Sequence, residues 1–100
     1  MAQYFNISGE LTQELIAQGD DIKASRMSLT NTHTTAMCTF DLYIEKKLKG
    51  KFYLLKGVEL PVGSTFAHGI NFDNSSEGFA LYIKLNKSAS ETPTVDVIIQ

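Results

Sequence analysis

The sequence predicts an all-β protein, folded as a single antiparallel β-sandwich or small barrel of about seven strands. Two observations carry this prediction. Apolar and polar residues alternate with a period of two in several stretches, as expected when one face of a strand is buried and the other is wet. Turn-forming residues separate these stretches at intervals of roughly 8–12 residues. A chain of 100 residues is long enough for one hydrophobic core and too short for two.

The first segment of the chain is the least regular part of the sequence. Gln3–Ile7 is expected to form a short strand. Glu10–Gln18 fits a short helical turn and a strand equally well, since Leu11 and Leu15 have the i,i+4 spacing of one helical face. We therefore expect residues 1–21 to form an N-terminal arm or short element.

The next segment, Ile22–Asn31, is predicted as a longer strand. Strict alternation puts Met27 and Leu29 on one face of this strand, and Ala24 and Arg26 on the other. The arginine suggests that its face is open to water or to a partner.

The clearest strand of the sequence is Ala36–Ile44, which alternates without interruption. Lys46–Lys51, with four lysines around a glycine, reads as a solvated hairpin loop. Phe52–Leu55 then returns as a strand rich in aromatic and aliphatic residues. Pro61 has no backbone N–H, so we expect it at a sheet edge or a strand end.

Three further strands are predicted at Ser64–Phe72, Phe79–Leu85 and Val95–Ile99, the first of them weakened by Gly69. Residues 22–100 therefore form the predicted sandwich domain. Its predicted core comprises Phe40, Leu42, Ile44, Phe52, Leu54, Leu60, Phe72, Phe79, Leu81, Ile83, Val95 and Val97.

Composition excludes several classes of protein. The longest apolar runs, such as Phe79–Ile83, are far shorter than the about 20 residues of a membrane-spanning helix, and we expect no secretory signal. The net charge of −2 argues against a dedicated nucleic-acid binder, because phosphate binding needs concentrated positive charge. A single cysteine excludes an intrachain disulfide and a thiolate metal cluster.

No catalytic constellation can be assembled from the sequence. His33 and His68 lack a carboxylate or second histidine at ligand spacing, and Cys38 lies on the apolar face of its strand. Asp73–Gly78 has oxygen donors but not the spacing of a calcium loop. Asp41 and surface acids like it are expected to be solvated. We expect no catalytic, metal or cofactor site, so a small hydrolase has the least support.

Four segments of the chain resemble small virion structural proteins of tailed bacteriophages. They are Met27–Thr32, Phe52–Ser64, Leu81–Leu85 and Val95–Ile99, and the resemblance covers roughly residues 22–99. It implies an Ig-like or jelly-roll-like sandwich that works in assembly. Family members decorate heads, form neck or tail collars, or belong to fibres and adhesion devices.

The leading hypothesis is therefore a non-enzymatic bacteriophage virion protein, foremost a capsid decoration or cement protein that stabilises the head by bridging subunits. Its partners would be the major capsid protein or other virion proteins, in a homo-oligomer or many symmetric copies, assembled in the host cytoplasm, with neither nucleic acid nor membrane. The expected partner-binding residues are Tyr4, Phe5, Leu11, Leu15, Arg26, Tyr43 and Tyr53. The alternatives are a head–tail connector, neck or tail-associated protein, or a carbohydrate-binding host-recognition domain that presents Tyr43, Tyr53 and Tyr82.

Overall fold

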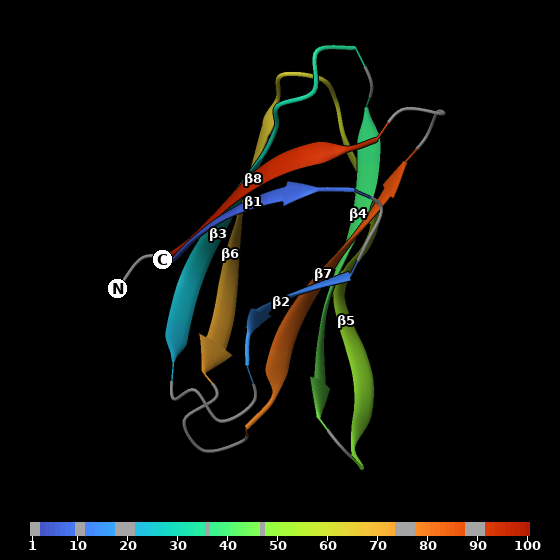
Figure 1. Cartoon of the computed structure of the whole chain (residues 1–100). Helices are drawn as coiled ribbons and strands as arrows, with labels where there is room; N and C mark the ends of the chain where they lie inside the picture. The colour runs from blue at the N-terminus through green and yellow to red at the C-terminus, as the bar shows by residue number, and fades with distance from the viewer. Residues whose placement is uncertain are drawn as a thin grey trace.

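The computed structural model describes residues 3–9, 12–17, 22–35, 37–46, 48–73, 78–87 and 92–100 (Figure 1). These residues form eight strands and no helix. The strands are β1 (Gln3–Ser8), β2 (Thr12–Ile16), β3 (Lys23–Asn31), β4 (Cys38–Lys46), β5 (Gly50–Leu60), β6 (Thr65–Asp73), β7 (Ala80–Lys87) and β8 (Thr94–Ile99). The predicted all-β class is confirmed.

The strands form two antiparallel sheets of four strands each. The first sheet has the order β1-β8-β3-β6 and the second the order β2-β7-β4-β5. Successive strands cross from one sheet to the other except at the β4–β5 hairpin (Figure 1). This eight-stranded order is that of a jelly roll, a sandwich in which two sheets enclose one core. The predicted β-sandwich is thus confirmed, in its jelly-roll form.

The core lies between the two sheets and follows the predicted alternation on the central strands. On β4, Phe40 and Leu42 are fully buried, and on β7 the alternate residues Leu81, Ile83 and Leu85 are buried in the same way. Burying each of these side chains contributes about 1.5–3 kcal/mol. Most of the predicted core is therefore correct.

Two predicted core residues, Phe52 and Leu54, are instead exposed. Both lie on β5, which is the edge strand of its sheet, and Leu54 falls where the pairing of β5 with β4 shifts register. The register shift displaces Leu54 from the regular alternation. Phe52 pairs regularly with Ile44 and is exposed because β5 has no neighbouring strand on its other side. Ile44 and Phe79 are partly buried against the core.

The segment expected as an arm belongs to the sandwich. β1 pairs with β8 along its whole length, from Gln3 opposite Ile99 to Ser8 opposite Thr94, and β2 pairs with β7. Of the two expectations for this segment, an arm or a short element, the described residues form short strand elements. The sequence did not show where they pack, because the partners of β1 and β2 lie at the other end of the sequence.

The ambiguity of Glu10–Gln18 also has a local cause. The pairing of β2 with β7 shifts register between Glu14 and Ile16, and both Leu15 and Ile16 turn into the core. Two adjacent buried residues break the period of two that identifies a strand. The described part of this segment is a strand.

A bulge likewise shifts the alternation of β3. The backbone N–H groups of Ser25 and Arg26 both donate to the carbonyl oxygen of Gln100, at 2.8 and 3.0 Å. The extra residue puts Ala24 on the same buried face as Met27, whereas strict alternation places them on opposite faces. Arg26 stays on the outer face, as predicted.

Asn31 fixes the end of β3 that lies beside the β5–β6 turn. Its buried side chain donates to the carbonyl oxygen of Leu60 at 2.9 Å and accepts the backbone N–H of His33 at 2.9 Å. Its own backbone carbonyl accepts the N–H of Gly63 at 3.1 Å. Pro61 directly follows β5, so its predicted place at a strand end is confirmed.

Candidate interaction surfaces

The described residues contain no group of three or more His, Cys, Asp and Glu side chains that could hold a metal ion. The two histidines lie in unrelated places. His33 follows β3 and its Nδ1 accepts the backbone N–H of Thr35 at 3.0 Å, while the ring of His68 on β6 stacks on Phe66 at a centroid distance of 5.9 Å. No helix within the described ranges is long and apolar enough to cross a membrane.

Cys38 lies inside the sandwich at the start of β4. Burial raises the pKa of its thiol above the usual value of 9.0. A thiol with a raised pKa forms little of the reactive thiolate at neutral pH. The side chain therefore serves as part of the core.

Three tyrosines form a row across the outer face of the second sheet. Tyr82 on β7 lies directly opposite Tyr43 on β4, and Tyr43 lies directly opposite Tyr53 on β5. The Tyr43 ring is 5.4 Å from each neighbour between centroids, stacked on Tyr82 at an interplanar angle of 19° and tilted against Tyr53 at 58°. We call these three residues the tyrosine row.

Charged side chains contact all three residues of the tyrosine row. The Lys51 Nζ lies 4.5 Å from the centre of the Tyr43 ring, and the Lys56 Nζ lies 4.5 Å from that of Tyr53. At the other end, the Tyr82 hydroxyl donates to Glu14 at 3.1 Å. Desolvation and this hydrogen bond raise the pKa of Tyr82. The row is a packed cation–π ladder, in which rings meet rings and ammonium groups.

This packing corrects the prediction that Tyr43 is an exposed contact. The residue is 5% exposed, because Tyr82 and Tyr53 flank its ring. A sugar stacks on an open ring face, and the stacked geometry leaves Tyr43 without one. The row therefore gives little support to the carbohydrate-binding alternative.

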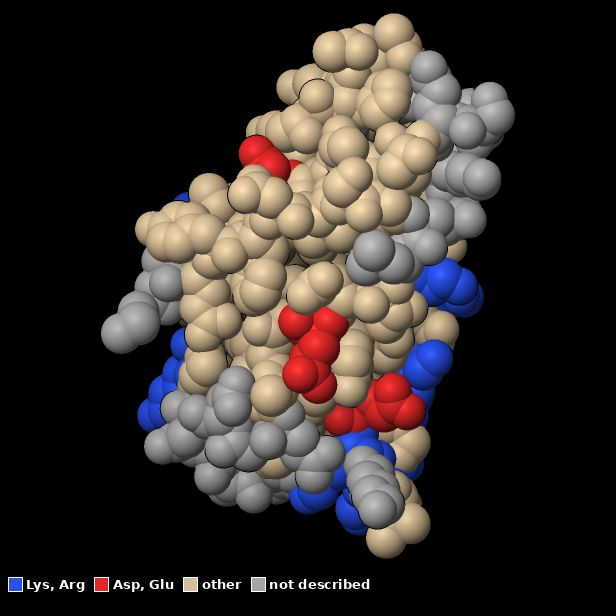
Figure 2. Space-filling model, viewed as in Figure 1, with Lys and Arg blue, Asp and Glu red and all other residues tan. Residues whose placement is uncertain are grey.

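Four exposed apolar side chains lie in the turn of the β4–β5 hairpin and on the adjoining half of β5. We call Leu48, Phe52, Tyr53 and Leu54, which are 99%, 51%, 45% and 41% exposed, the hairpin patch. Lysines at 46, 47, 49, 51 and 56 flank it in the sequence, and Figure 2 shows blue residues around the lower end of the molecule, where Figure 1 places this hairpin. An apolar patch with a charged rim is typical of a surface that contacts another protein.

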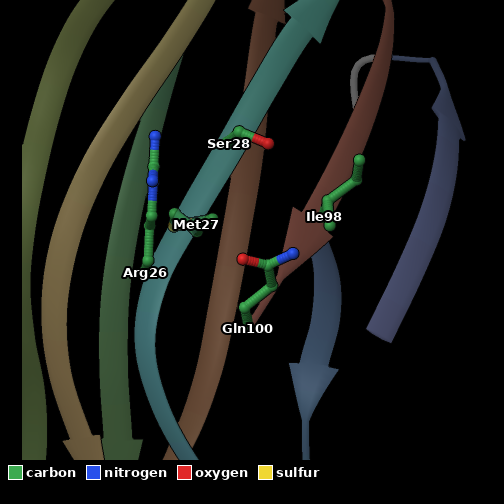
Figure 3. A pocket seen from close by; sticks show the side chains of 5 residues that line it. All are labelled: Arg26, Met27, Ser28, Ile98 and Gln100. Carbon is green, nitrogen blue, oxygen red and sulfur yellow. The ribbon is translucent and has the colours of Figure 1, made fainter. Parts of the chain in front are cut away.

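The outer face of the first sheet carries a second exposed area. Tyr4 on β1 and Ile98 on β8 lie opposite each other and are both exposed. Beside them is a groove of about 270 Å³ lined by Arg26, Met27, Ser28, Ile98 and Gln100 (Figure 3). In Figure 3, Ser28, Ile98 and Gln100 face one another across β3 and β8, whereas Arg26 extends along the other side of β3.

A third feature is a slot of about 210 Å³ at the open side of the sandwich, where edge strands β5 and β6 face each other. Its lining is largely apolar and comes from both sheets. The residues are Ile44, Leu54, His68, Gly69, Ile70 and Phe72.

The structure separates the predicted contact residues rather than joining them. Tyr4 and Arg26 are exposed on the first sheet and Tyr53 on the second. Phe5 is partly buried against the core, and Leu15, at 4% exposure, belongs to it, so Leu15 is not available to a partner. Leu11 lies outside the described residues.

Alternation assigns Phe52 and Leu54 to the core, so sequence reasoning missed both as surface residues. Leu48 lies in the 46–51 loop, which was expected to be solvated, and is exposed. The four lysines at 46–51 could have predicted the exposure of Phe52 and Leu54, because lysines concentrate at the exposed edges of sheets.

No protein-family model and no curated protein matches this chain. Among solved structures, it is similar to the Yersinia pseudotuberculosis-derived mitogen, with a TM-score of 0.62 and 13% identity over 100% of this chain and 85% of the mitogen. The two proteins share a fold. At this identity the likeness extends to the sandwich alone.

The chain is also similar to VP2 in the infectious bursal disease virus subviral particle, with a TM-score of 0.41 and 9% identity over 98% of this chain. A structure of the Gx strain of that virus gives a TM-score of 0.44 and 10% identity over 99% of this chain. The chain spans 32% and 33% of those two chains, about a third of each.

Proposed function

We propose that this protein is a non-enzymatic virion structural protein that acts by adhering to neighbouring protein subunits. The hairpin patch is the observation that carries the proposal. Leu48 and Phe52 hold apolar surface in water at the hairpin end of the sandwich, and Leu54 does so at its open side. A contact that buries this surface gains roughly 25 cal/mol for each Å² removed from water. A rigid jelly roll supports such a contact without ordering a flexible chain.

Within this class we propose a capsid decoration role, on the basis of the sequence resemblance to small virion proteins of tailed bacteriophages. A decoration protein bridges subunits that are repeated around a symmetric shell. Each copy needs only a modest contact, because attachment at several points multiplies weak affinities. The lysine rim of the hairpin patch suits an acidic surface on the capsid protein.

The direct test is the composition of purified particles from cells that produce this protein. Mass spectrometry should find the chain in the particles at hundreds of copies if it decorates the shell. A copy number of about six or twelve would point instead to a neck or tail position, since those parts are rings. Absence from the particles contradicts the virion proposal.

A pair of variants tests the role of the hairpin patch. Leu48→Ser combined with Phe52→Ser should remove the protein from particles while its melting temperature stays close to the unmodified value. The matched control is Ile98→Ser, which replaces an exposed apolar residue on the opposite sheet. Incorporation unaffected by the double substitution, or lost equally in the control, rules out the hairpin patch as the adhesive surface.

A further inference from the structure

The two edge strands at the open side of the sandwich are protected very differently. Edge strands expose unpaired backbone groups, and proteins guard them with charges, bulges or short length. β5 has register shifts and carries Lys51 and Lys56. β6 is nine residues long and has no charged residue from Thr65 through Phe72. The edges on the opposite side, β1 and β2, are only six and five residues long.

The two faces of β6 differ in a way that suits an additional strand. Ala67 and Gly69 lie opposite Ser28 and Arg26, so they belong to the outer face, where their small size leaves room. Phe66 and His68 lie opposite the buried Leu29 and Met27, so they belong to the inner face. A segment paired to β6 would extend the inner and the outer face of the first sheet by one strand.

The inner face of that segment would meet the apolar slot. The slot lies between β6 and β5, and its lining includes Ile70 of the first sheet and Leu54 of the second. Leu54 is an exposed leucine at the mouth of an otherwise buried core. One apolar side chain from an added strand would fill this space and cover Leu54.

The outer face of that segment would meet Arg26. Arg26 is exposed, makes no ion pair with a described residue, and lies directly opposite Gly69. Since Gly69 has no side chain, the guanidinium has an open path across β6 toward the edge. Figure 3 shows the Arg26 side chain extended beside β3, away from Ser28, Ile98 and Gln100. A carboxylate on the added strand would complement it.

We propose that β6 binds an extended segment of a partner protein by strand addition, with an acidic residue beside Arg26 and an apolar residue in the slot. This inference rests on the proposed function, because it names the chemistry of the adhesive partner. A second copy of this chain fits less well. Two β6 strands paired antiparallel about Gly69 would bring no carboxylate to Arg26, because β6 is uncharged from Thr65 through Phe72.

Synthetic peptides of the length of β6 provide the probe. The first is a capped peptide of alternating valine and threonine with glutamate at its central threonine position. The second has lysine at that position, and the third keeps the glutamate but has proline in place of the neighbouring valine. In NMR titrations of the whole chain, the glutamate peptide should slow amide exchange within 65–73, whereas the proline peptide should not, because it lacks a pairing N–H.

Charge reversal at Arg26 tests the recognition. The unmodified protein should prefer the glutamate peptide to the lysine peptide by about two- to fivefold, the range of an exposed ion pair. Arg26→Glu should invert this preference. The control Lys51→Glu reverses an exposed charge on the guarded edge, β5, and should leave the preference unchanged.

Several results would overturn the proposal. Equal binding of the proline peptide excludes strand addition, and an unchanged preference in Arg26→Glu excludes the acidic partner. Dimerisation that protects residues 65–73 would show that the occupant is a second copy. These measurements use no particles, so a protein that binds the peptides but is absent from virions refutes the proposed function alone. A virion protein that binds no peptide refutes this inference alone.

Discussion

The carboxylate of Asp41 accepts a hydrogen bond of 2.7 Å from the backbone N–H of Gly57 on the neighbouring strand. Its other oxygen lies 3.8 Å from the Lys56 ammonium, and the side chain is 10% exposed. The two residues meet where the pairing of β4 and β5 shifts register, and Gly57 has a φ of 64°. A side chain on one strand thus satisfies the N–H that the irregular strand leaves unpaired.

Replacing Asp41 should therefore destabilise the protein. Asp41→Ala leaves the Gly57 N–H without its partner and should lower the free energy of unfolding by about 1–3 kcal/mol. Asp41→Asn keeps an acceptor oxygen and loses the ion pair with an exposed lysine, so its loss should be smaller. Urea unfolding of both variants measures the difference. Equal losses would mean that the hydrogen bond to Gly57 contributes nothing.

The Phe40 ring fills the centre of the core. It is fully buried on β4 and meets Phe66 of the opposite sheet edge to face, with centroids 5.6 Å apart. Phe40→Ala should cost about 3–5 kcal/mol of unfolding free energy, through lost burial and the cavity left behind. Phe52→Ala, on the exposed edge strand, should cost much less. Chemical denaturation of the pair checks both values, and similar costs would contradict the assigned faces.

The hydrogen bond between Tyr82 and Glu14 predicts that the stability of the protein depends on pH in the alkaline range. Desolvation and then the hydrogen bond to Glu14 raise the pKa of Tyr82 above its usual value of 10.0. In the unfolded chain Tyr82 ionises earlier, so the protein should lose stability as the pH rises from about 10 through the folded-state pKa. Below that range the contribution is fully present.

Substitution of Glu14 tests this account. Glu14→Gln should lower the pKa of Tyr82 toward the usual value in an NMR titration of the tyrosine rings, with Tyr82→Phe identifying the signal. Glu59→Gln removes a carboxylate from β5 that does not act on Tyr82 and serves as the control. If the pKa of Tyr82 is the same in Glu14→Gln as in the unmodified protein, the Glu14 carboxylate does not raise it.

The reaction rate of the buried Cys38 thiol can report how often the core opens. It is the single cysteine of the chain, it is buried, and burial raises the pKa of its thiol. A thiol reagent should label the native protein slowly, at a rate that follows opening of the sandwich, and label the protein in denaturant at once. Rapid labelling without denaturant would show that the thiol is accessible in the folded state.

The sequence predicts the central strands well, because their alternation is undisturbed. Residues 38–46 and 80–87 are strands with the expected buried faces. The errors lie where pairing shifts register. The bulges at Ser25 and near Leu15 each insert one extra residue into the strand. Beyond each bulge, the residues that face the core are therefore not the ones that the alternation before it predicts.

The candidate surfaces were less predictable than the fold. Tyr43 looks like a surface aromatic in the sequence, because its partners Tyr53 and Tyr82 come from strands that only the three-dimensional pairing places beside it. Leu54 looks like a core residue because alternation does not reveal that β5 lies at an edge. Which strands are edges is a property of the whole sheet, and the lysines at 46–51 are a local sign of it that alternation does not use.

The order of strands has a consequence for how the chain folds. Of the six ladders that the described residues form, the β4–β5 ladder joins neighbours through a tight turn, and the other five join strands distant in sequence. Closing long loops costs entropy before any contact is gained, so folding on the order of milliseconds to seconds is expected of such a topology. During synthesis β1 emerges from the ribosome long before its partner, β8. β1 must therefore wait for β8, and its apolar face stays unpaired until β8 has also been made.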